Sequence, residues 1–223
     1  PIPLSEAKVL PLVTPSKVVC VGLNYKAHAE ELGYPLPNMP SFFLKPPSSI
    51  IGNGEPIVLP SGMGRIEHEA ELAMVVGKVC RNLTPEEAEE SLFGFTCAND
   101  VTAREVQKVD PLIGHCKSYD TFCPISPWIE TELEDINDLS IRCLVNGEVR
   151  QSANTGDMIF RPLDLLCFLS RVMTLMPGDV ILTGTPPGIS PIQADDVVQV
   201  SIEGIGTLSN PVEGPGPEEK ILQ

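Results

Sequence analysis

Basic side chains are scarce in this sequence, in which 15 Lys and Arg stand against 30 Asp and Glu among 223 residues. The formal net charge is −15. Non-specific binding of nucleic acid needs a basic face, so this class of protein is excluded. The same charge disfavours anionic substrates unless a metal ion or local lysines and arginines reverse it.

Segments for membrane insertion or export are also missing. No stretch approaches the roughly 20 apolar residues of a membrane-spanning helix. The start, Pro1-Ile2-Pro3-Leu4, lacks the basic residues and the long apolar core of a signal peptide. The seven cysteines form no CxxC pair, and four of them lie in apolar runs typical of a protein core: Cys20, Cys97, Cys143 and Cys167. We therefore expect a reducing, cytoplasmic setting and no membrane partner.

Three widespread active-site patterns are absent as well. The sequence has no GxSxG elbow, no Walker A pattern and no GxGxxG after an expected strand. Serine hydrolase and nucleotide-binding functions are therefore unsupported. Cys116 lies beside Lys117, which would lower a thiol pKa, but a buried and unreactive thiol is the better interpretation.

Glycine and proline, by contrast, are abundant, with 18 Gly and 23 Pro against a usual combined share of about 12 per cent. Many turns favour a β-rich fold over a helical bundle. Asn146-Gly147 between two apolar runs predicts a type I′ hairpin. Thr84-Pro85-Glu86-Glu87 predicts a helix start with a capping box, and the apolar spacing of 162–173 predicts a core-packed helix. Neither an internal repeat nor a convincing domain linker is visible.

The most informative stretch runs from His68 to Gly77 and reads as a β-strand. Side chains alternate along a strand, so Glu69 and Glu71 point to the same face. A face in contact with solvent would explain this pair without any function. If the pair is buried, it costs several kcal/mol or forces protonation unless a cation compensates it.

A third carboxylate, Asp100, follows another apolar run, expected as a strand over 91–101. Small residues on the face of Asp100 leave room for a ligand cavity. Three oxygen anions without a nearby Cys or His pattern suit Mg²⁺, Mn²⁺ or Ca²⁺ rather than zinc. Thr102 is expected to cap a short helix that begins directly after Asp100.

A second short helix is expected between Asn24, as its N-cap, and Gly33, at its C-terminal end. His28 and Glu31 are three residues apart and share a face of it. They are either an exposed helix pair of small energetic value or a general base with the carboxylate that orients it.

Several donors lie near these groups in the sequence. Lys45 ends an apolar strand, and Arg104 and Gln107 share a face of the helix expected after Asp100. Together with Lys117 they could surround an anionic substrate, although each alone is typical of a protein surface. The turn from Gly184 to Gly188 exposes backbone N–H groups that could bind carboxylate oxygens.

Taken together and in order, these motifs resemble the fumarylacetoacetate hydrolase family over about residues 17–211. The matching pieces are Gly22-Leu23-Asn24-Tyr25-x-x-His28-x-x-Glu31, Phe43-Leu44-Lys45-Pro46, His68-Glu69-x-Glu71-Leu72, Asn99-Asp100-x-Thr102-Ala103-Arg104-x-x-Gln107, Asn146-Gly147-Glu148 and the stretch from Pro177 to Gly188. The resemblance implies a mostly β, α+β fold, a mixed β-sandwich or roll with short helices, usually as a homodimer. We expect an irregular segment at 1–16, a catalytic domain at 17–211 and a tail at 212–223.

The resemblance also implies a site. Glu69, Glu71 and Asp100 would hold Mg²⁺ or Mn²⁺, which chelates the 2-oxo-carboxylate end of a substrate and stabilises an enolate. Lys117, Arg104 and Gln107 would position the substrate or stabilise developing charge, with Lys45 as a further donor. In hydrolysing members the pair matching His28 and Glu31 activates water. Thr185 would contact the substrate carboxylate.

The reaction itself has several candidates. The leading hypothesis is cleavage of a C–C bond in a small 2-oxo acid, by acylpyruvate hydrolysis or oxaloacetate-type decarboxylation. The alternative is an isomerase or decarboxylase of hydroxymuconate-type dicarboxylates in aromatic catabolism, such as 2-hydroxyhepta-2,4-diene-1,7-dioate isomerase. By the same resemblance, segment 108–116 is shorter than in acylpyruvase-like members, and Leu23 stands where some of those members carry Arg. Both features favour this branch. A β-domain with a purely structural cation is the non-enzymatic hypothesis.

Overall fold

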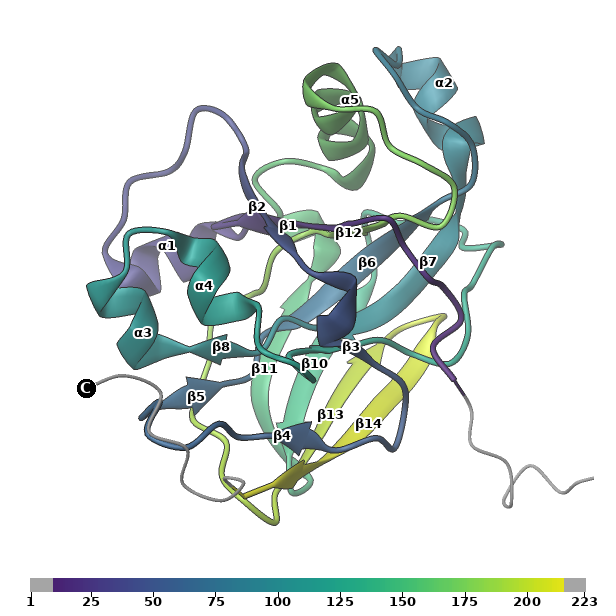
Figure 1. Ribbon diagram of the computed structural model, residues 1–223. Helices are drawn as coiled ribbons and strands as arrows, with labels where there is room; N and C mark the ends of the chain where they lie inside the picture. The colour runs from purple at the N-terminus through teal and green to yellow at the C-terminus, as the bar shows by residue number, and fades with distance from the viewer. Residues whose placement is uncertain (1–9, 215–223) are drawn as a thin grey trace, which may run out of the picture.

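Two five-stranded sheets form the framework of the protein in the computed structural model, which describes residues 10–214 (Figure 1). The first sheet is mixed, because β1 pairs with β12 in parallel and the other neighbours are antiparallel. Its strands lie in the order β2 (Ser41–Lys45), β1 (Val18–Gly22), β12 (Val180–Leu182), β6 (Ala70–Val76) and β7 (Leu92–Asn99).

The second sheet is built around the predicted hairpin, whose turn residues Asn146 and Gly147 both have positive φ. Its strands lie in the order β11 (Glu148–Asn154), β10 (Ser140–Val145), β13 (Val197–Ile202), β14 (Gly206–Glu213) and β4 (Ile57–Val58). Two short pairs complete the strands, β3 (Ile50–Ile51) with β9 (Cys123–Pro124) and β5 (Ile66–Glu67) with β8 (Thr102–Ala103).

The helices are short, which together with the sheets confirms the predicted mostly β, α+β class. They are α1 (Lys26–Leu32), α2 (Pro85–Ser91), α3 (Arg104–Val109), α4 (Ile113–Lys117) and α5 (Pro162–Val172), with 3₁₀ turns η2 (Pro47–Ser49) and η3 (Thr155–Asp157). Helices α2 and α5 lie together at one end of the first sheet, and α1, α3 and α4 lie at its side (Figure 1). No helix among residues 10–214 has the length and apolarity needed to span a membrane.

The main core fills the space between the two sheets. Alternate residues of β6, such as Leu72 and Met74, meet Ile141, Val200 and their neighbours from the second sheet there. The opposite face of the first sheet carries a smaller apolar cluster that includes Cys20, Phe43 and Ala98. Glu69 and Glu71 alternate with the core residues, so they emerge on this second face.

The register of β6 and β7 brings the three candidate metal ligands together. Ala70 pairs with Asn99 and Glu71 with Ala98, and the N–H of Asp100 donates to the carbonyl of Glu69. Residues directly opposite each other in an antiparallel pair point to the same face. Asp100 therefore stands beside Glu69, and the small Ala98 leaves space opposite Glu71.

Several local predictions are confirmed. Thr84 and Glu87 form both hydrogen bonds of the capping box of α2, with Pro85 at its first position. Gly33 ends α1 with φ 70°, and the helix predicted over 162–173 is α5. The seven cysteines are all free and buried.

Two predicted caps are wrong, and for the same reason. The Asn24 side chain does not cap α1; it bonds the backbone of Phe160 and Thr183 and ties three segments together. Thr102 lies in β8 and donates to the carbonyl of Asp100 and to Glu69, while α3 begins at Arg104. In both cases a small polar side chain forms hydrogen bonds with buried groups of other segments instead of with the free backbone N–H groups at a helix end.

The described residues include only part of the expected N-terminal segment and tail. Residues 1–9 of the N-terminal segment lie outside the described residues, and 10–16 contain neither helix nor strand. Strand β14 includes Val212 and Glu213, so it extends two residues into the expected tail, of which 215–223 also lie outside the described residues. The division into segments otherwise stays a prediction.

Candidate active site

The three predicted metal ligands form one buried cluster. One carboxylate oxygen from each of Glu69, Glu71 and Asp100 lies within 4.8 Å of the others. The side chain of Glu71 is closed off on one side by the turn after β12, where the Gly184 N–H donates to it at 2.5 Å. Gly184 has φ 99°, and a Cβ there would stand 2.7 Å from Cβ of Asn24, so this close approach requires glycine.

The electrostatics of the cluster fit a divalent cation. Burial raises the pKa of Glu71 well above its ordinary value, and the neighbouring Asp100 and Glu69 carboxylates raise it further. A cation bound among the three oxygens would relieve this repulsion. Buried oxygen ligands of this kind match the preference of Mg²⁺ and Mn²⁺ for carboxylates.

Three cationic side chains already neutralise part of the cluster. Lys117 Nζ lies 2.6 Å from both Glu69 and Asp100, and Lys45 Nζ lies 2.5 Å from the other oxygen of Asp100. Arg104 pairs with Glu69 and also with Glu67. Burial alone would raise the pKa of Glu69, but Lys117 and Arg104 outweigh burial and hold it below its ordinary value.

Lys117 is charged in this environment. Burial lowers the pKa of its ammonium group, but Asp100 and Glu69 raise it more, so that it lies above the ordinary lysine value. The same side chain stands over the ring of Phe43, with Nζ 5.2 Å from the ring centroid. In the metal-free protein, Lys117 is therefore a positive charge held between Asp100 and Glu69.

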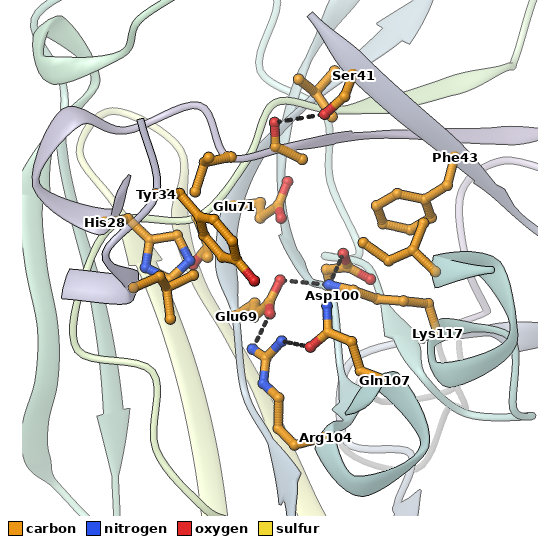
Figure 2. A pocket seen from close by; sticks show the side chains of 16 residues that line it. His28, Tyr34, Ser41, Phe43, Glu69, Glu71, Asp100, Arg104, Gln107 and Lys117 are labelled. Atoms are coloured by element: carbon orange, nitrogen blue, oxygen red, sulfur yellow. Dashed lines mark hydrogen bonds and ion pairs between the residues drawn. The ribbon is translucent and has the colours of Figure 1, made fainter. Parts of the chain in front are cut away.

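A cavity of about 290 Å³, which we call the main cavity, opens on this cluster (Figure 2). Most of the predicted site residues line it: Glu69, Glu71, Asp100, Lys117, Arg104, Gln107, His28 and Thr185. Gln107 accepts from Arg104 Nη1 at 2.7 Å, which orders both side chains. Helices α1, α3 and α4 thus each contribute to one site.

Lys45 differs from the expectation of a substrate contact. It does not line the main cavity but lies behind Asp100, where it also donates to the carbonyl of Phe122 at 2.7 Å. Its side chain is fully buried. Lys45 is positioned to balance the charge of Asp100.

His28 and Glu31 form the predicted pair, with His28 Nδ1 2.8 Å from Glu31 Oε2. The other Glu31 oxygen accepts from the Gly188 N–H at 3.0 Å. The interpretation as an exposed helix pair is wrong for His28, whose side chain is 7% exposed and lines the main cavity. Glu31 is thus anchored by the turn after β12 and orients the imidazole.

A buried chain of polar side chains behind Thr185 was not predicted. Gln151, on edge strand β11, donates to Thr185 Oγ1 at 2.8 Å and lies 3.0 Å from His68 Nδ1. The Thr185 hydroxyl itself donates to the carbonyl of Ala70. The hairpin pattern of the sequence places Gln151 in a strand, but nothing in that pattern indicates that its side chain is buried.

The thiols near the site are unsuited to nucleophilic chemistry. Burial is the main reason that the pKa of Cys116 rises to about 11 and that of Cys123 to about 12. The thiolate, which is the reactive form, is then scarce at neutral pH. The prediction that Cys116 is buried is confirmed, and its raised pKa agrees with the prediction that it is unreactive.

Comparison with known proteins assigns this architecture to a family. Residues 17–213 match the sequence model of the fumarylacetoacetate (FAA) hydrolase C-terminal family. The human mitochondrial protein named oxaloacetate tautomerase FAHD2A is 42% identical over 225 residues, which covers 95% of this chain and 71% of that protein.

Two solved structures have the same fold. The 5-carboxymethyl-2-hydroxymuconate delta-isomerase from Mycobacterium smegmatis superposes with a TM-score of 0.90 at 46% identity, covering 97% of this chain and 86% of that one. The maleylpyruvate hydrolase from Sphingobium sp. SYK-6, solved in complex with manganese(II) ion and pyruvate, has a TM-score of 0.84 at 36% identity and covers 96% and 77% of the two chains.

Proposed function

Since this chain belongs to the fumarylacetoacetate hydrolase family, we propose that it is a divalent-cation-dependent enzyme that cleaves a C–C bond in a small 2-oxo acid. The observation that carries the proposal is the main cavity, where three buried carboxylates, a fixed ammonium group and a histidine–glutamate pair converge. A structural cation alone would not need a cavity lined by such donors.

Glu69, Glu71 and Asp100 would hold Mg²⁺ or Mn²⁺. The maleylpyruvate hydrolase with manganese and pyruvate, which has this fold, supports both the metal and a 2-oxo acid ligand. When bound, the cation supplies Lewis-acid polarisation of the 2-oxo group.

The cationic donors of the main cavity would bind the substrate. Arg104 is held in place by Glu67, Glu69 and Gln107. It would present positive charge, together with Lys117, to a carboxylate or to an oxygen that gains charge during the reaction. Charges held by buried partners need little reorganisation, which is the condition for effective transition-state stabilisation. Thr185, fixed by Gln151, would contribute a further contact to the substrate carboxylate.

His28 would act as general base. In hydrolysis it takes a proton from water, the hydroxide adds to the acyl carbonyl carbon, and the C–C bond breaks with its electron pair passing to the 2-oxo acid fragment. That fragment regains a proton and leaves as a 2-oxo acid. Glu31 keeps Nδ1 of His28 hydrogen-bonded and so presents Nε2 as the proton acceptor.

A second candidate is a proton-shift reaction, tautomerisation or isomerisation of a 2-oxo acid without bond cleavage. It is favoured by the similarity to the hydroxymuconate isomerase at 46% identity and to the oxaloacetate tautomerase at 42%. Such a reaction needs the cation and a side chain that carries a proton from one atom of the substrate to another, for which Lys117 is the candidate, but it needs no activated water. It should therefore survive the loss of His28.

One set of assays separates these possibilities. Purified protein with Mg²⁺ or Mn²⁺ is tested on acetylpyruvate and oxaloacetate, with His28→Ala beside the wild type. A matched control is His115→Ala, because His115 pairs with Asp110 in an exposed position outside the main cavity. Loss of cleavage only in His28→Ala supports hydrolysis, and retained tautomerisation in both variants supports the second candidate.

Absence of turnover on both substrates would reject the main proposal. Thermal stability then tests the non-enzymatic hypothesis. A purely structural cation should stabilise the protein with no further effect of oxalate, a small mimic of the 2-oxo acid end. The homodimer and the cytoplasmic location stay predictions, the first to be checked by light scattering after size exclusion.

A further inference from the structure

Tyr34 stands at the mouth of the main cavity, on the segment that joins α1 to β2. Figure 2 shows its ring between His28 and Glu69, with the hydroxyl end directed into the main cavity. The residue is 61% exposed, so its ring forms part of the entrance rather than of the core. No hydrogen bond within residues 10–214 uses its hydroxyl group. The hydrogen of this group is therefore available to a ligand.

The backbone of Tyr34 is fixed to α1, the helix that carries the proposed general base. The Gly33 N–H donates to the carbonyl of Glu30 at 3.1 Å. The Tyr34 N–H donates to the carbonyl of Ala29 at 2.9 Å. These two bonds form a Schellman motif, which needs the left-handed φ of 70° at Gly33. Pro35 then restricts Tyr34 to an extended conformation. The same helix end thus positions both the tyrosine and the base.

The other donors of the main cavity already have acceptors. Lys117 donates to two of the candidate metal ligands at 2.6 Å each. Each nitrogen of Arg104 donates to a neighbouring carboxylate or amide oxygen. The Thr185 hydroxyl donates to the carbonyl of Ala70. An oxygen that gains negative charge in the cavity would have to compete for these groups, whereas the single O–H of Tyr34 has no other acceptor.

The place of Tyr34 fits the step in which water adds to the substrate. In the proposed reaction the 2-oxo acid end is held at the metal-ligand cluster, and the acyl carbon lies two bonds farther along the substrate. As hydroxide adds to that carbon, an electron pair of the C=O bond moves to the acyl oxygen, which becomes an oxyanion. Because Tyr34 lies between the base and the cluster, its hydroxyl group faces the region that the acyl oxygen would occupy.

We propose that Tyr34 is a further catalytic residue, whose hydroxyl group donates a hydrogen bond to the acyl oxygen when that oxygen becomes an oxyanion. This inference rests on the proposed function, because it presupposes hydrolysis of an acylpyruvate-type substrate. The hydrogen stays on the tyrosine throughout. When the C=O bond re-forms, the C–C bond breaks and its electron pair passes to the 2-oxo acid fragment. A neutral donor suits this site, since it neither repels a cation nor needs a carboxylate partner.

The test compares two reactions of the Mn²⁺-loaded protein, only one of which forms an acyl oxyanion. Hydrolysis of acetylpyruvate forms it, whereas tautomerisation of oxaloacetate moves only a proton beside the 2-oxo group. Tyr34→Phe keeps the ring and removes the hydroxyl group. It should lower kcat for acetylpyruvate about 10- to 100-fold with little change in KM, less than for a buried donor because water at the mouth partly replaces the hydroxyl group. Oxaloacetate tautomerisation should stay within about twofold of the wild type.

Tyr119→Phe is the matched control. The Tyr119 hydroxyl donates to Met63 Sδ at 3.2 Å, and Tyr119 does not line the main cavity. This variant should leave both reactions unchanged. The Tyr34 side chain is exposed, so removal of its oxygen atom should not affect folding, which circular dichroism verifies for both variants.

Each result has a distinct meaning. Unchanged acetylpyruvate hydrolysis in Tyr34→Phe would overturn the role of Tyr34 and leave the proposed function standing. An equal loss in both reactions would overturn it as well, because the hydroxyl group would then act at the shared 2-oxo end or only shape the entrance. A wild type that tautomerises oxaloacetate without hydrolysing acetylpyruvate would also overturn it, since no acyl oxyanion would form. Absence of both reactions in the wild type would reject the proposed function, and the role of Tyr34 with it.

Discussion

Replacement of Lys117 by Met tests the charge balance of the site directly. The ammonium group lies 2.6 Å from two of the three candidate metal ligands, Glu69 and Asp100, in a fully buried position. It therefore occupies the space between them and opposes an incoming cation. Lys117→Met should lower the folding stability of the metal-free protein, increase its affinity for the metal ion and abolish most of the activity.

The size of the stability effect follows from the contacts. Removal of one partner of a buried ion pair costs about 3–5 kcal/mol. The lower end applies, since Arg104 still pairs with Glu69 and Lys45 with Asp100. A loss of about 3 kcal/mol lowers the melting temperature of a domain this size by about 6–12 °C.

Saturating Mn²⁺ stabilises the wild type and the variant alike, so the difference between them narrows only through tighter binding by the variant. A tenfold lower Kd narrows it by about 1.4 kcal/mol. Thermal unfolding is therefore measured in EDTA and in saturating Mn²⁺, with Mn²⁺ affinity from calorimetry. Activity should fall about 10²- to 10³-fold, as for the loss of one transition-state donor.

The control is Lys78→Met, which removes an exposed lysine 3.8 Å from Glu90 and should change stability by less than about 0.5 kcal/mol. An equal drop in melting temperature with and without Mn²⁺ would refute the reasoning. Weaker Mn²⁺ binding by Lys117→Met would refute it as well, since the ammonium would then be supporting the metal rather than competing with it.

Three further substitutions probe other parts of the molecule. Glu71→Gln should stabilise the metal-free protein by about 1–2 kcal/mol, because it removes a buried charge that its neighbours repel, and should abolish Mn²⁺ binding in calorimetry; a destabilised apoprotein would contradict this. Burial raises the pKa of Asp179, but hydrogen bonds from Lys17 and others outweigh burial and hold this pKa below its ordinary value. The carboxylate therefore stabilises the fold above about pH 4, and this stabilisation is lost as the pH falls through the lowered pKa. In urea unfolding, the free energy of unfolding of Asp179→Asn should be about 2 kcal/mol below that of the wild type at pH 7 and nearly equal to it near pH 2. A difference that does not change with pH would exclude the charge effect. Gln151→Leu leaves the buried Thr185 without its donor and should raise KM more than it lowers kcat; an unchanged KM would show that Thr185 needs no such support.

Only part of the metal-ligand cluster was predictable from short-range rules. Alternation along a strand places Glu69 and Glu71 on one face. That Asp100 joins them was implied by the family resemblance, because its position beside Glu69 depends on the pairing of β6 with β7. Gly33 and the Thr84 cap follow from similarly local chemistry. For such features, a few neighbouring residues determine the geometry.

Long-range partners were not predictable in the same way. Asn24 is an acceptable helix cap by residue type, but its partners Phe160 and Thr183 are far away in the sequence. Gln151 and Lys45 resemble ordinary strand residues until the packing of the sheets buries them.

The pairing of β6 with β7 has a consequence for folding. A slip of one residue between these strands would exchange their two faces, turning the acidic side chains into the apolar interior and the leucine and methionine outward. No misaligned species could then keep both a core and a cation site. Mn²⁺ uptake should accordingly appear during refolding only when this strand alignment is complete, which would make the ion a reporter of the native state.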